Sequence, residues 1–297
     1  MLGHVGLNSS RTGLLAFIGL LGVTTPLFSQ THQGGIRKQK HPPRDSIQEK
    51  VRQDLGEAME EEDAIRELFT LGDGAVPSLI KFLSDTGKDR RAGAARGLAY
   101  IGNQQGMQAV RNAVKAEKDA ETKSAMSCFL AGGLVETKLE SDLDFLRSTV
   151  ERAQFVADDD ETAFSAVCAA LALGMRGGSD SLAVLRKVAK ADVIGVEEIG
   201  KAIQWMENKS TPRQAPDAQS LSDEELIKKF VLDDTFFAQE ERSRTSVEGL
   251  TFNRQRNKAL VSLEIYHGPK DARGYDLVLA KESGVWRVVG IWFAWVA

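Results

Sequence analysis

Histidine is almost missing from the part of the chain that has globular composition. Of the four histidines, His4, His32 and His41 fall within the first 45 residues, and only His267 follows. Ser-His-Asp and Cys-His mechanisms need a histidine base, and zinc sites rely on His and Cys ligands. The sequence therefore favours a non-enzymatic protein, and it predicts no catalytic residue, no metal and no cofactor.

Cysteine is scarce as well, since Cys128 and Cys168 are the only two in the chain. A chain of this length with two cysteines is not a disulfide scaffold. Both fall near equivalent positions of neighbouring predicted helices. Packed helices lie about 8–10 Å apart, whereas a disulfide needs Cα atoms within about 7 Å. Two buried free thiols are therefore expected, although an oxidising compartment would favour a bond.

The chain also lacks a strong charge of either sign. Its net charge is −4, which gives no pull toward nucleic acid or anionic lipid, so no nucleic-acid partner is predicted. One basic strip could meet an anionic partner, but acidic residues such as Asp89 and Glu117 are interspersed, and a solvated face is the preferred interpretation. The strip comprises Lys88, Arg90, Arg91, Arg96, Arg111 and Lys115.

Residues 1–29 are predicted to be a signal peptide. Arg11 precedes an apolar run at residues 14–23, and small Ser29 marks the expected cleavage site. The run is short for a membrane span, which needs about 20 residues. Export to the periplasm or the medium of a bacterial-type cell is expected, with no stable span after cleavage. The alternative is a membrane anchor formed by an uncleaved signal.

Residues 30–45 read as a disordered linker, and residues 46–208 as helical repeats. A capping box at Ser46 and Glu49 opens the helical region. Glycines about 30 to 40 residues apart are expected to close the first helix of each pair, and such a period is typical of a solenoid. These glycines are Gly72, Gly102, Gly133 and Gly174. Leu98, Leu171 and Leu173 are expected to be buried between helices.

Two stretches carry a resemblance to a known family. Leu68-Phe69-Thr70-Leu71-Gly72, followed by Ala75-Val76-Pro77-Ser78-Leu79, is echoed by Gly97-Leu98-Ala99-Tyr100-Ile101-Gly102. This pattern resembles HEAT repeats and covers about half of the chain. The resemblance implies a scaffold that binds a protein partner, whose identity the sequence does not give.

Residues 209–221 are predicted to be a second linker, and residues 222–297 a small α+β domain. A capping box at Ser222 and Glu225 opens its helix, after which the apolar period changes from 3.6 to 2 over four strands. Gly274-Tyr275-Asp276-Leu277 and residues 283–289 resemble the C-terminal half of NTF2-like domains. That resemblance implies an alternative function, a small-ligand-binding or enzymatic domain that uses Asp276, Tyr266 or His267.

The final strand, residues 285–296, holds three of the four tryptophans. Strict alternation places Trp286 and Trp292 on one face with Val288 and Val296. The other face then carries Val285, Val289, Ile291, Phe293 and Trp295. Both faces are apolar, so both need a cover. The domain's own helix supplies one, and the repeats, a partner or a second copy supplies the other; pairing of NTF2-like domains through the sheet slightly favours a homodimer.

Taken together, the sequence predicts a mainly α protein. A HEAT-like helical-repeat solenoid is followed by a small α+β domain of one helix and a four-stranded antiparallel sheet. The expected function is an exported scaffold or protein-binding module that uses the solenoid surface, and a structural envelope component is a further alternative. The candidate interaction residues are Arg90, Arg91, Arg96, Trp292 and Trp295.

Overall fold

The computed structural model describes residues 50–51, 62–152, 160–190, 196–207, 221–233, 244–268 and 271–296. Within these ranges, no side chain is described at residues 62, 160–162, 196, 233, 267, 268, 271, 295 or 296. The predicted signal peptide, the first linker, the capping box at Ser46 and residues 209–220 of the second linker lie outside the described residues.

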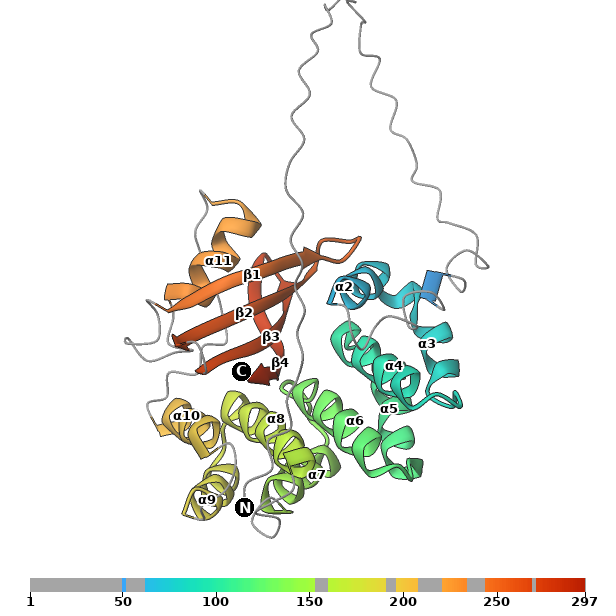
Figure 1. Ribbon diagram of the computed structural model, residues 1–297. Coiled ribbons are helices and arrows are strands. Elements are labelled where there is room, and N and C mark those ends of the chain that lie inside the picture. Colours follow the sequence, from blue (N-terminus) through green and yellow to red (C-terminus); the bar gives the residue numbers. More distant parts are fainter. Residues whose placement is uncertain are drawn as a thin grey trace, which may run out of the picture. The chain divides into compact units, whose positions relative to one another are not determined.

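The described part of the chain is mainly helical and ends in an antiparallel sheet, as the sequence predicts (Figure 1). Its first helices are α2 (Glu62–Leu71), the 3-10 turn η1 (Gly72–Gly74), α3 (Val76–Phe82), α4 (Lys88–Ile101), α5 (Gln104–Ala116) and α6 (Ala120–Gly132). They are followed by α7 (Glu140–Arg152), α8 (Asp160–Arg176), α9 (Ser179–Val188) and α10 (Val196–Glu207). The C-terminal elements are α11 (Asp223–Asp233), β1 (Thr245–Phe252), β2 (Lys258–Gly268), β3 (Asp271–Glu282) and β4 (Val285–Val296).

The even-numbered helices pack side by side in chain order, α2 against α4, α4 against α6, α6 against α8 and α8 against α10. A second row is formed by odd-numbered helices, in which α3 packs against α5 and α7 against α9. Small residues allow these close approaches, since a Cβ at Gly174 would lie 2.6 Å from the Cβ of Ala202 on α10. The expected burial of Leu98, Leu171 and Leu173 is confirmed, because each side chain is 0% exposed.

The expected role of Gly174 is wrong. Gly102 does end its helix, with the left-handed φ of 61° that favours glycine. Gly174 instead lies inside α8, which continues to Arg176 and is followed by Gly177 and Gly178 at φ 81° and 113°. The apolar period predicted the helix but not its end, because a buried glycine needed for close packing and a glycine that ends a helix look alike in sequence.

The expectation of two free thiols is also wrong, since Cys128 on α6 and Cys168 on α8 form a disulfide. Their Cα atoms are 5.2 Å apart. The usual helix spacing of about 8–10 Å is measured between helix axes, whereas Cα atoms lie about 2.3 Å from each axis. Two Cα atoms that face each other across adjacent helices are therefore within reach of a disulfide.

The four strands pair in the order β1-β2-β3-β4, each antiparallel to the next. The capping box that opens α11 is confirmed, because the Ser222 backbone N–H donates to Glu225 at 2.9 Å and the Glu225 N–H donates to the Ser222 hydroxyl at 3.3 Å. The turn between β3 and β4 uses Ser283 and Gly284 at φ 51° and 87°, as expected for a two-residue hairpin turn.

The strict alternation expected in β4 is broken by two bulges. Leu277 pairs with Ile291 but Leu279 pairs with Val288, so Val289 is an extra residue. A second bulge lies at Ala294. Each bulge inserts one residue and reverses the faces that follow it. Trp286, Val288, Ile291 and Phe293 therefore share one face, and Trp292 lies on the other with Gly290, Asp276 and Ser262.

Both faces of the sheet are covered by helices of the same chain, which confirms that both needed a cover. On the Trp286 face, the Trp286 indole donates to Asp223 of α11 at 2.9 Å, and Tyr275 donates to Glu198 of α10 at 3.3 Å. On the opposite face, Trp292 is 1% exposed and its ring lies 4.5 Å from that of Tyr100 on α4. The preference for a second copy as the cover of this face is therefore wrong.

Candidate functional site

A buried carboxylate joins the helices to the sheet. Asp276 on β3 is 2% exposed and accepts hydrogen bonds from the Tyr100 hydroxyl at 2.5 Å, the Ser262 hydroxyl at 2.6 Å and the Arg96 guanidinium at 3.2 Å. Arg96 and Tyr100 lie one turn apart on α4, so both reach the same carboxylate. We call Arg96, Tyr100, Ser262 and Asp276 the junction network.

The electrostatics of the junction network favour a structural role. Burial raises the pKa of Tyr100, so the phenol stays protonated and donates a hydrogen bond to Asp276. Burial acts to lower the pKa of Arg96, but its interactions with Tyr100 and Asp276 outweigh burial and the net shift is upward. The guanidinium therefore stays charged, and neither Arg96 nor Tyr100 exchanges a proton near neutral pH.

Further polar contacts tie the sheet to three other helices. Trp292 donates its indole N–H to the carbonyl of Phe129 on α6 at 2.9 Å. Arg273 on β3 pairs with Glu198 on α10 at 3.1 Å. Arg66 on α2 donates to Ser262 at 2.8 Å. These contacts come from α2, α6 and α10, so the sheet lies against the row of even-numbered helices.

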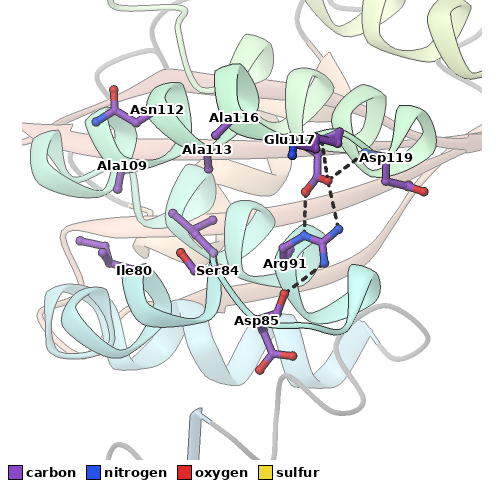
Figure 2. Close-up of a pocket in the computed structure, with 12 residues that line it drawn as sticks. Ile80, Ser84, Asp85, Arg91, Ala109, Asn112, Ala113, Ala116, Glu117 and Asp119 are labelled. Atoms are coloured by element: carbon purple, nitrogen blue, oxygen red, sulfur yellow. Dashed lines mark hydrogen bonds and ion pairs between the residues drawn. The ribbon is translucent and has the colours of Figure 1, made fainter.

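A groove opens on the other row of helices, between α3 and α5 (Figure 2). We call it the α5 groove; its volume is about 780 Å³. Its apolar part is formed by Ile80, Leu83, Ala109, Ala113 and Ala116. Its polar part is formed by Ser84, Asp85, Arg91, Asn112, Glu117, Lys118 and Asp119.

An ion pair closes one end of the α5 groove (Figure 2). Arg91 makes two bonds to Glu117, at 2.7 Å and 3.0 Å, and donates to the carbonyl of Asp85 at 3.1 Å. The hydrogen bond from Arg91 is the main cause of the lowered pKa of Glu117. Glu117 is therefore ionised near neutral pH and has no proton to donate, so this end of the groove is suited to recognition rather than to acid catalysis.

A second hollow of about 890 Å³ adjoins the first along α5. The two share Ile80, Ala109 and Asn112, so they form neighbouring parts of one surface. Leu139, which is 53% exposed, lies at the edge of the second hollow. An apolar surface edged by polar residues is typical of places where proteins bind other proteins.

The predicted interaction residues are divided between the α5 groove and the helix–sheet junction. Arg91 lines the α5 groove, and Arg90 lies next to it in the chain and pairs with Asp85 at 3.4 Å. Arg96 and Trp292 come together at the helix–sheet junction, where both are largely buried. The side chain of Trp295 lies outside the described residues.

Sequence reasoning missed the acidic partners of the basic strip. Lys88 bonds to Glu121, Arg91 to Glu117, and Arg111 to Asp142 at 2.5 Å. The partners are 26 to 33 residues away, about the period that the sequence predicts for the helical repeats. That offset is a signal that a search for charge pairs at the repeat period would have found.

Of the residues named for an enzymatic C-terminal domain, the two whose side chains are described, Asp276 and Tyr266, do not come together. Asp276 bonds to Arg96, Tyr100 and Ser262, whereas Tyr266 is 50% exposed. The side chain of His267 lies outside the described residues. Nowhere in the described ranges do three or more His, Cys, Asp or Glu side chains gather so as to hold a metal ion. None of the described helices has the length and apolarity needed to cross a membrane.

Comparison of the chain with models of known protein families finds no match, and comparison with curated proteins finds no significant relative.

Proposed function

We propose that this protein is an exported, non-enzymatic binding module whose helical pairs form a HEAT-like solenoid. The pairing of α2, α4, α6, α8 and α10 in chain order supports this arrangement, because each unit of a solenoid packs mainly on its neighbours. The one helix and antiparallel meander of the C-terminal region support a truncated NTF2-like domain.

The observation that carries the proposal is the division of the helical surface. The sheet lies against the row of even-numbered helices, and the α5 groove lies on the other row. The groove combines an apolar floor with a polar rim, in which Arg91 is already paired with Glu117. We infer that it binds a segment of a protein partner, with Ile80 and Ala109 in the apolar contact.

The proposed export has support of its own. Disulfides form and persist in oxidising compartments and are rare in the cytosol. The bond between Cys128 and Cys168 is therefore in keeping with the export that the N-terminal residues predict. In such a compartment the bond would stabilise the pair of helices on which β4 lies.

Photo-crosslinking in the source cells tests this function. A photoreactive amino acid at Asn112 is expected to capture one defined partner, and Ala109→Arg should reduce the yield at least about tenfold, because a buried, unpaired charge opposes binding. A photoreactive group at Lys187, whose side chain is 63% exposed on α9, is the matched control and should not capture that partner. In the crosslinked complex, this protein should begin at Gln30.

Two results would contradict the proposal. Equal capture at Asn112 and Lys187 would show that the α5 groove is not a specific surface. A crosslinked complex in which this protein retains Met1 would show that the signal peptide is not removed.

A further inference from the structure

The disulfide joins the two helices that carry β4. Cys128 lies on α6 and Cys168 on α8, and both residues are 0% exposed. These two helices also contact β4, which is an edge strand of the sheet (Figure 1). The covalent bond therefore fixes the spacing of the surface on which this strand lies.

The fit of β4 on this surface is close at three points. Trp292 donates to the carbonyl of Phe129, the residue that follows Cys128. A Cβ at Gly132 would lie 2.3 Å from the Trp292 indole nitrogen, so α6 approaches the ring as closely as glycine allows. The Cys168 sulfur lies 4.0 Å from the carbonyl oxygen of Phe293. A small change in the spacing of α6 and α8 would disturb all three contacts.

We propose that the oxidation state of Cys128 and Cys168 controls the docking of Trp292 on α6. A dithiol reduces the bond by giving up two electrons and two protons; the protein gains two thiols and the dithiol becomes a disulfide. The two sulfurs, no longer bonded, need the larger separation of a van der Waals contact. Because both residues are fully buried, that separation requires α6 and α8 to move.

Burial also determines when the oxidation state of Cys128 and Cys168 can change. A thiolate must reach one sulfur of the bond, and neither cysteine is accessible in the folded chain. Exchange therefore requires local opening or takes place before folding is complete. A chain in a reducing compartment carries two thiols and an undocked Trp292 indole. Oxidation to the disulfide then allows Trp292 to dock on α6.

The four tryptophans allow a direct test by NMR, since the full-length protein labelled with 15N has four indole N–H groups. Trp292→Phe assigns the Trp292 signal. After reduction with dithiothreitol, verified by thiol alkylation and mass spectrometry, hydrogen exchange of the Trp292 indole should become at least about tenfold faster. The Trp286 indole, which donates to Asp223 on the opposite face, is the internal control and should keep its rate.

A variant with Cys128→Ala and Cys168→Ala completes the test, because dithiothreitol should leave its Trp292 signal unchanged. The proposal is overturned if reduction changes neither indole rate, since the joint is then independent of the bond. It is also overturned if both rates rise together, which indicates general unfolding, or if dithiothreitol alters the double variant.

Discussion

Asp276→Ala is expected to lower the free energy of unfolding by about 3–5 kcal/mol, because it leaves a buried charge without its partner. The side chain of Arg96 is 15% exposed, and Asp276 is the carboxylate to which it donates. Tyr100 also loses its acceptor, and Ser262 loses one bond. Urea unfolding followed by circular dichroism measures the change.

Two further variants separate this effect from others. Adding Arg96→Met to Asp276→Ala removes the unpaired charge, and it should recover a large part of the lost stability. Glu151→Ala breaks an exposed pair with Lys187, and its cost should stay below about 1 kcal/mol. A cost for Asp276→Ala as small as that for Glu151→Ala would show that the junction network is accessible to water.

Trp292→Ala is expected to lower the free energy of unfolding by about 3–5 kcal/mol, because a large buried ring is replaced by a cavity. Trp292 is 1% exposed, packs on Tyr100 and donates to Phe129. The contacts lie within one chain, so the molecular mass measured by light scattering should equal that of the parent protein. Leu139→Ala, at a position 53% exposed, is the control and should change stability by less than about 0.5 kcal/mol.

The opposite result would mean that a second copy, and not α4 and α6, covers the face of the sheet that carries Trp292. If Trp292→Ala leaves stability unchanged and halves the mass of the parent, a second copy packs on Trp292. The sheet would then be detached from α4 and α6 in solution.

The elements that local sequence determines were predicted well. The helical region was expected to end at residue 208, and α10, its last described helix, spans Val196–Glu207. The last strand was expected at residues 285–296, and β4 spans Val285–Val296. Apolar period, capping residues and turn residues all act within a few positions of the chain, so one sequence is enough to recognise them.

The features that depend on distant residues could not be predicted. Asp276 meets Arg96 from 180 positions away, and no local pattern selects that partner. The bulges at Val289 and Ala294 moved Trp292 to the face opposite Trp286, because one inserted residue reverses the alternation. The α5 groove was not predicted, because its shape arises only when the helices pack.

Helices and sheet are expected to unfold as one unit, which leaves the α5 groove as the surface for a partner. Equilibrium unfolding in urea, followed at once by circular dichroism and by tryptophan fluorescence, tests it most directly. Helices dominate the first signal, and three of the four tryptophans lie in β4. One transition with the same midpoint for both probes is expected. Two separate transitions would contradict it, because the sheet would then come off the helices before they unfold.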